Sequence, residues 1–341
     1  MSPRTTSLAL AGVLSLAAAS AGPSIAGATT EPPTDDTQAA TDATSSGETF
    51  VVGVSNLGLS FPFPASISDG IMARASELGV EIVEFDAQGD VDKQTNDVDD
   101  LIAQDVDAIL LLPLDGGVAE SQVEAANEAG IPIIAVAAQV GDPNERDLRD
   151  VFPGLVALVT QDELAAGAAA GDIAVELLPD GGEVAIIEGA AGFAEVTTRA
   201  VLFEERLAEA DAEFEIVARQ PGDWLPDVAE AACQNILASN PDVALIYAQS
   251  DDMSVGCAQA IASAGSDAIT IGIGGSGLGI DAIRDGTVAG TVCYKPFDMG
   301  ELALQTMYDH LSGASVLDDE FVTYETPPIT AENVDDCDPQ W

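Results

Sequence analysis

Ten short apolar runs alternate with segments of helical pattern between residues 50 and 294, and this alternation limits the possible folds more than any other feature. Runs such as "DAILLLP" (107–113) and "DVALIYA" (242–248) are continuously apolar, which is typical of strands buried on both faces. Helical segments such as "GVAESQVEAANEAG" (117–130) end in glycine just before the next run, as helix C-termini often do. The pattern predicts parallel sheets flanked by helices, and about 290 residues suffice for two such sheets.

The first 28 residues have the pattern of a secretory signal peptide. Arg4 precedes the uncharged run "LALAGVLSLAAASA" (8–21), which is shorter than the roughly 20 residues of a spanning helix, and the small-residue site "AGA" (26–28) follows. Residues 29–48 are rich in Thr, Ser, Asp and Pro and are interpreted as a disordered linker. We therefore expect an exported protein in the periplasm or outside the cell, with no membrane insertion and no lipid-anchoring cysteine.

The charge of the chain is strongly negative. Acidic residues number 59 and basic residues 10, which gives a formal net charge of −49. Such a surface repels phosphate backbones and anionic membranes, so a nucleic-acid partner is not expected. Dense carboxylates are better explained as a means of keeping an exported protein soluble.

Four cysteines in an exported chain favour disulfides, and the absence of CxxC spacings or histidine partners argues against a metal site. Three pairings are possible. We expect Cys233 to pair with Cys257, because they lie on consecutive helices around one strand, which right-handed crossovers place side by side. Cys293 and Cys337 would then join the tail "NVDDCDPQW" to the strand "GTVCY".

Four motifs follow one another along the chain: "DLIAQDVDAI" (100–109), "ANEAGIPII" (126–134), "AQSDDMSVGCAQAI" (248–261) and "GIGGSGLGIDAIRDGTVAGTV" (272–292). In this order they resemble the ribose-binding-like solute receptors of ABC sugar transporters, and the resemblance extends from about residue 49 to residue 325. It implies two Rossmann-like α/β lobes joined by a three-stranded hinge, with the ligand in the cleft between them. The implied lobes are 49–161 plus 294–320 and 162–293 plus 321–335.

The resemblance also implies a function. The protein would capture a small organic solute, sugar or sugar-like, by closing its lobes near Gln161 and Asp162. It would then deliver the solute to the membrane permease of an ABC importer, acting as a monomer, without catalysis and without a cofactor.

Several positions depart from the pattern of the family's sugar binders. Polar or charged sugar contacts are replaced at Phe61, Ala137, Ala138, Gly274 and Tyr294. The polar ligand contacts that remain by resemblance are Asp115, Thr197, Ser250 and Asp251, and the expected aromatic walls are Phe61, Phe63, Trp224 and Tyr294. Arg199 is interpreted as structural. This set suits a compact solute with an apolar or ring face and one or two donor groups, including a cation; a sugar bound in another pose is the alternative.

A dinucleotide site and the alternative functions have weaker support in the residues. "GIGGSG" (272–277) matches GxGxxG, the pattern of a dinucleotide-binding loop. It follows a strand late in the chain, however, and the acidic residue expected at the end of the next strand is absent. Asp251 and Asp115 could act as an acid and base pair in an exported hydrolase. The other alternative is a sensor subunit that reports the ligand to a membrane kinase or chemoreceptor.

Overall fold

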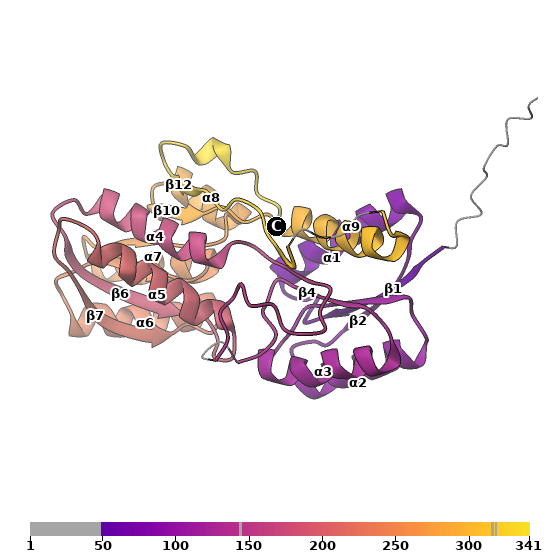
Figure 1. Ribbon diagram of the computed structural model, residues 1–341. Coiled ribbons are helices and arrows are strands. Elements are labelled where there is room, and N and C mark those ends of the chain that lie inside the picture. Colours follow the sequence, from indigo (N-terminus) through magenta and orange to yellow (C-terminus); the bar gives the residue numbers. More distant parts are fainter. Residues whose placement is uncertain (1–48, 143–144, 315–316, 318) are drawn as a thin grey trace, which may run out of the picture. The chain divides into compact units, whose positions relative to one another are not determined.

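The computed structural model describes residues 49–341 except 143, 144, 315, 316 and 318. The predicted signal peptide and linker lie outside these residues. The described part of the chain forms two α/β lobes, each built on a six-stranded sheet (Figure 1). Among the described residues, no helix has both the length and the hydropathy to cross a membrane.

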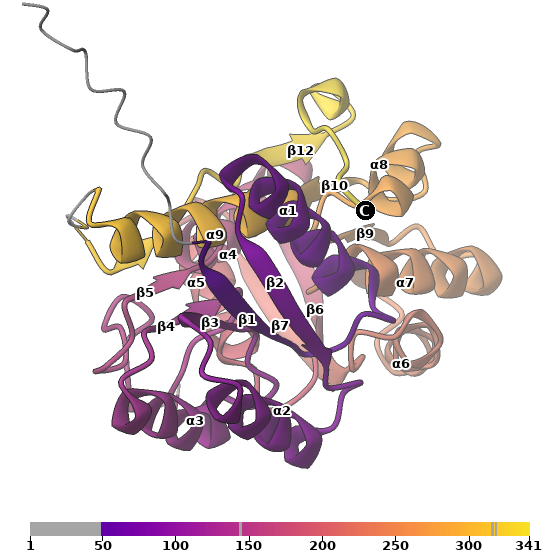
Figure 2. The ribbon, with the colours of Figure 1, turned by 90° about the vertical axis from the view of Figure 1, so that its right-hand side faces the viewer.

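The first lobe has the sheet order β11-β5-β4-β3-β1-β2. Its elements are β1 (Val51–Asn56), α1 (Pro62–Leu78), β2 (Glu81–Asp86), α2 (Val91–Ala103), β3 (Ala108–Leu111), α3 (Gly116–Ala129), β4 (Ile133–Val136), β5 (Ala157–Val159), α9 (Pro296–Ser312) and β11 (Phe321–Val322). Helices α1 and α9 cover one face of the sheet, and α2 and α3 cover the other (Figures 1 and 2). All of its strand pairs are parallel.

The second lobe repeats this plan with the order β12-β10-β9-β8-β6-β7. Its elements are α4 (Glu163–Leu177), β6 (Gly182–Glu188), α5 (Ala194–Ala208), β7 (Phe214–Pro221), α6 (Pro226–Ser239), β8 (Val243–Ala248), α7 (Asp251–Ala264), β9 (Ile269–Ile271), α8 (Gly277–Arg284), β10 (Gly290–Val292), β12 (Pro328–Thr330) and the 3-10 turn η1 (Val334–Asp336). Helices α4 and α5 pack on one face, and α6 and α7 pack on the other. Only the edge strand β12 is antiparallel to its neighbour among the described pairs.

The predicted strands are confirmed, because each of the ten apolar runs overlaps one of the strands β1 to β10. Burial explains why these runs do not alternate with polar residues. Ile109, Leu110 and Leu111 of β3 are all fully buried, since helices cover both faces of the sheet.

One lobe boundary differs from the prediction. Phe321 and Val322, placed with the second lobe from the sequence, pair with β5 in the first sheet. The main chain accounts for this: Leu158 N donates to Glu320 O (2.8 Å), and Thr160 N donates to Val322 O (3.0 Å). The chain therefore returns to the second lobe only after Val322, and two residues are enough to cover the edge of β5.

Helices α1 and α9 approach each other through glycines. A side chain at Gly70 of α1 would overlap the carbonyl of Phe297, and one at Gly300 of α9 would overlap the carbonyl of Ile67. The first lobe is therefore completed by a helix that lies more than 200 residues further along the chain, after strands β6 to β10 of the second sheet.

Both predicted disulfides are present. Cys233 of α6 pairs with Cys257 of α7, with Cα atoms 5.3 Å apart. Cys293, just after β10, pairs with Cys337 in the segment that follows η1, with Cα atoms 5.9 Å apart.

Candidate functional site

A cavity of about 190 Å³ lies where strands of both sheets end. Leu57 follows β1 and Ala137 follows β4 on the first-lobe side, while Ser250 follows β8 and Ile273 follows β9 on the second-lobe side. Ligands of open parallel sheets bind beyond these carboxyl ends of strands. Because sites for drug-sized ligands usually measure about 300–1,000 Å³, this cavity suits a compact solute.

The first-lobe wall of the cavity is apolar. It consists of Leu57, Phe63, Pro64, Ala137 and Ala138. Ala137 and Ala138 are two of the positions where the sequence predicted that charged ligand contacts have been lost, and they do line the cavity. A hydroxyl group facing this wall would find no side-chain partner, at a cost of about 1–3 kcal/mol.

The second-lobe wall carries the polar groups. Its ionisable members are Glu195, Arg199, Asp251 and Asp252, and Gln249 and Ser250 add neutral polar atoms. Desolvation raises the pKa of Asp251 to about 6, against the lowering effect of hydrogen bonds from Thr291 and Ser276, and it also raises the pKa of Asp252. A group that donates hydrogen bonds or carries positive charge is therefore favoured on this side.

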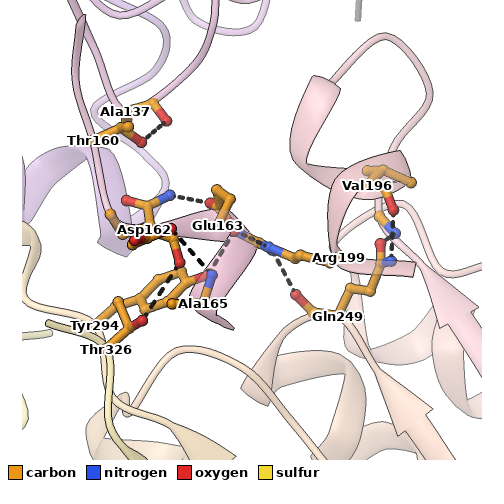
Figure 3. A network of polar contacts seen from close by, with 12 residues as sticks. Ala137, Thr160, Asp162, Glu163, Ala165, Val196, Arg199, Gln249, Tyr294 and Thr326 are labelled. Carbon is orange, nitrogen blue, oxygen red and sulfur yellow. Dashed lines mark hydrogen bonds and ion pairs between the residues drawn. The ribbon is translucent and has the colours of Figure 1, made fainter. Parts of the chain in front are cut away.

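A buried ion pair stands where the chain crosses between the lobes (Figure 3). Arg199 donates to the Glu163 carboxylate through Nε (2.6 Å) and Nη2 (2.7 Å). The same carboxylate accepts from the Tyr294 hydroxyl (2.7 Å) and from the side chain of Gln161. Gln161 belongs to the first crossing between the lobes, Glu163 begins α4 directly after it, and Tyr294 belongs to the second crossing. The contacts of the Glu163 carboxylate therefore link two of the three crossings.

The Arg199 guanidinium has further contacts besides the ion pair. Its Nη1 donates to the main-chain oxygen of Gln249 (2.9 Å), and its guanidinium lies 5.6 Å from the Trp224 ring centre and 5.3 Å from that of Tyr294. The Gln249 side chain in turn accepts from Gly189 N (3.0 Å) and donates to Val196 O (2.8 Å). The cation thus fixes two aromatic rings of the cavity relative to each other.

Trp224 occupies a strained position. It has φ 63° and follows Asp223 at φ 52°, a left-handed region that non-glycine residues rarely adopt. A side chain at Gly189 would overlap the indole ring, so this glycine leaves room for it. The turn therefore keeps a strained backbone conformation and places the tryptophan side chain in the cavity lining.

Ser250 and Asp251 have structural partners as well as a place in the cavity wall. Ser250 caps α7 by accepting from Met253 N (3.2 Å). The Asp251 carboxylate accepts from Ser276 N (2.7 Å) and from the Thr291 hydroxyl (2.6 Å), which joins the start of α8 to β10. Gly272, which begins the run "GIGGSG", and Gly279 of α8 serve this packing, because a side chain at either position would overlap the Asp251 carboxyl group.

The structure brings together five of the eight residues predicted to contact the ligand: Phe63, Trp224, Ser250, Asp251 and Tyr294. The cavity lining does not include the other three. Phe61 is 44% exposed, Asp115 caps α3 by accepting from Val118 N (3.0 Å), and Thr197 lies on the exposed side of α5. Asp115 and Asp251 are therefore not paired in the cavity as the hydrolase alternative requires.

Sequence reasoning missed several residues of the lining: Gln161, Phe193, Glu195, Gln249, Asp252 and Trp341. Arg199, interpreted as structural, also lines the cavity while making its structural ion pair. A signal for Trp341 was available, since the expected disulfide at Cys337 fixes the tail four residues away. Glu195 had no such signal, because an acidic residue in the first turn of a helix is usually explained by the helix dipole.

The surroundings of Glu195 predict a specific dependence of stability on pH. Burial raises its pKa from 4.5 to about 7, although nearby Arg199 opposes the shift. Between these values the folded state keeps a proton that the unfolded chain releases, so the stability contributed by this group falls as pH rises from 4.5 to 7. We expect urea unfolding across this window to show a flatter pH profile for Glu195→Gln than for the wild type.

The matched control for this prediction is Glu205→Gln, because Glu205 lies on the exposed side of the same helix. An unchanged profile for Glu195→Gln, or an equal change in both variants, would contradict the assignment.

Comparison with known proteins adds three findings. A family model described as a periplasmic binding protein domain matches residues 52–315. The ribose import binding protein of Bacillus subtilis is 32% identical over 268 residues, which cover 78% of this chain and 83% of that protein. The xylitol-binding protein of Mycolicibacterium smegmatis is 29% identical over 296 residues, which cover 86% and 81%.

Among solved structures, an ABC transporter solute-binding protein from Mycobacterium smegmatis with bound glycerol is similar to this chain. The two share 30% sequence identity and a TM-score of 0.76, over 85% of this chain and 96% of that one.

Proposed function

We propose that the cavity of this chain, which belongs to the periplasmic binding protein family, captures a compact sugar or polyol with one apolar face and a donor-rich edge. The chain is a solute-binding receptor of the kind that serves ABC importers. We base the choice of solute on the contrast between the apolar first-lobe wall and the polar second-lobe wall of the cavity.

The two walls select for different faces of the solute. Carbon-bound hydrogens or a deoxy position would face Leu57, Phe63 and Ala138 in the first lobe. Hydroxyl or amine donors would face Glu195, Asp252 and Ser250 in the second lobe. Relatives of this chain are named for ribose, allose and xylitol, which are small and rich in hydroxyl groups. We place the solute in this class, with a deoxy or amino derivative as the best fit to the walls.

We further propose that the lobes close on the solute about the three crossings, near Gln161, Tyr294 and Thr323, and that the protein works as an exported monomer. The closed form would then be recognised by the permease of an ABC importer. Hinge motions of this kind take place at a few residues between rigid lobes. In the described part of the chain, the main chain passes between the two sheets three times: after β5, after β10 and after β11.

The test is a binding screen with D-ribose, D-allose, xylitol, myo-inositol and glycerol, together with deoxy and amino sugars. Calorimetry measures the affinity, small-angle scattering reports the closure, and analysis of the solute afterwards shows whether it is recovered intact. We expect saturable binding with a smaller radius of gyration and an unchanged solute. Binding without contraction would contradict the hinge, and conversion of the solute would contradict a receptor without catalysis.

Asp252→Asn is expected to weaken the strongest-binding solute of this screen by about 10- to 100-fold, because a hydrogen bond to a charged group contributes about 1.5–3 kcal/mol. The matched control is Asp115→Asn, which keeps a good helix cap at a carboxylate outside the cavity lining. Equal affinities for the two variants would show that the second-lobe wall does not contact the solute.

A further inference from the structure

The last residues of the chain form a short segment, Cys337–Trp341, that we call the strap. It begins at the Cys293–Cys337 disulfide, where Cys337 packs in a small core with Ile280, Ile283 and Ile329 of the second lobe. A side chain at Gly275 would overlap the Cys337 sulfur. The strap is thus anchored in the second lobe by a covalent bond and by close packing.

From this anchor the strap reaches the first lobe. The Gln340 side-chain oxygen accepts from Phe297 N (2.9 Å) and Asp298 N (3.3 Å), and its amide donates to the Asp298 carboxylate (2.6 Å). These are the first main-chain donors of α9, whose own N-terminal residue makes no side-chain cap. The Gln340 main-chain oxygen also accepts from the Ser66 hydroxyl of α1 (2.9 Å). Gln340 therefore caps a helix of the first lobe from a segment bonded to the second.

Trp341 directly follows Gln340 and lines the cavity. Its indole meets the Phe63 ring edge to face, with centres 5.3 Å apart, and its carbonyl oxygen accepts from Gly277 N at the start of α8 (2.9 Å). A side chain at Gly274 would come within 3.1 Å of the indole, so this glycine keeps the space open. Contacts from both lobes thus fix the ring at the edge of the cavity.

We propose that Trp341 is a solute-contacting residue, delivered to the site by the strap and held there by Gln340 and the Cys293–Cys337 disulfide. This assignment rests on the proposed solute-binding function. The ring lies beside Phe63 and Gly274, so it extends the apolar side of the cavity and favours a solute that presents carbon-bound hydrogens there. The strap also adds a fourth link between the lobes, after the three crossings of the main chain.

The affinity test uses Trp341→Ala and Trp341→Phe with the strongest-binding solute of the screen. Loss of the aromatic contact should weaken binding about ten-fold in Trp341→Ala, and phenylalanine should restore most of it. Leu278→Ala is the matched control, because Leu278 is a 49% exposed apolar residue of α8 beside the strap. Wild-type affinity in Trp341→Ala would overturn the proposal.

A second measurement needs no solute. The chain has two tryptophans, so Trp224→Phe leaves Trp341 as the only one. In this background we expect Gln340→Ala, and separately the removal of Cys293 and Cys337, to increase the quenching of Trp341 fluorescence by acrylamide. Circular dichroism checks that each variant is folded, and the milder Gln340→Ala keeps the test valid if the loss of the disulfide unfolds the protein.

The two measurements separate failure of this proposal from failure of the proposed function. If no solute of the screen binds the wild type, the proposed solute class is wrong, and the quenching experiment decides the role of the strap. Unchanged quenching in Gln340→Ala would then overturn the proposal, and increased quenching would support the part of it in which Gln340 holds Trp341 in the cavity wall.

Discussion

Arg199→Met will lower the free energy of unfolding by about 3–5 kcal/mol, the usual cost of leaving one partner of a buried ion pair without the other. The Arg199 and Glu163 side chains are only 7% and 2% exposed, so water cannot replace the lost cation. Tyr294 and Gln161 would still donate to the carboxylate, but neither neutralises its charge. Chemical denaturation with urea measures the loss.

Two further variants make this prediction specific. Arg206→Met removes ion pairs with Asp172 and Glu209, in which the three side chains are 44%, 50% and 69% exposed, and it should cost much less than Arg199→Met because solvent screens exposed pairs. The double variant Glu163→Gln with Arg199→Met should recover much of the stability, since no uncompensated charge stays buried. If Arg199→Met costs no more than Arg206→Met, the buried pair is not a major support of the hinge region.

Removal of the disulfides should have the next largest effect. Cys293 and Cys337 are 44 residues apart, and opening this loop should cost about 4 kcal/mol through the entropy of the unfolded chain. Cys233 and Cys257 are 24 residues apart, and replacing both with serine should cost about 3 kcal/mol. Thermal unfolding of each double-serine variant, with the wild type under reducing conditions for reference, measures both values. A larger effect for Cys233 and Cys257 would contradict this entropic account.

The fold could be predicted from the sequence because its determinants are local and repeated. A run such as "DAILLLP" indicates a strand covered on both faces, and glycine at the C-terminus of α3 marks where a helix stops. The short strand β11 escaped this reasoning. Its two residues have no periodicity, and only the unpaired edge of β5 decides where they lie.

The candidate site could be predicted in part, for a different reason. Trp224 was expected as an aromatic wall by resemblance, and it lines the cavity in the turn that follows β7. Arg199 was interpreted as structural, and its place in the cavity wall was missed because its partners are distant in sequence: Glu163 is 36 residues away, and Gln249 is 50. Pairings over such separations depend on how α4, α5 and β8 pack, and no local pattern carries that information.

Asp115 and Thr197 are predicted ligand contacts that lie outside the cavity lining. The position of each in a resembling motif suggested a ligand contact, but Asp115 satisfies the main chain of α3 and Thr197 faces solvent. A carboxylate between a strand and a helix can cap the helix N-terminus or contact a ligand. The sequence alone does not separate these two roles, because the same residue type suits both.

The glycine contact between α1 and α9 has a consequence for how the chain folds. The face of α1 that carries Gly70 fits α9, which lies beyond residue 295, and the edge of β5 is covered only by Phe321 and Val322. The first lobe therefore cannot reach its final form while the chain emerges, although its sheet core is synthesised first. Contacts between residues so far apart in sequence slow folding, because the entropic cost of closing the long loop comes before the contacts can stabilise it. We expect the second lobe, continuous from α4 to β10, to fold earlier, leaving the first lobe open until most of the polypeptide is available.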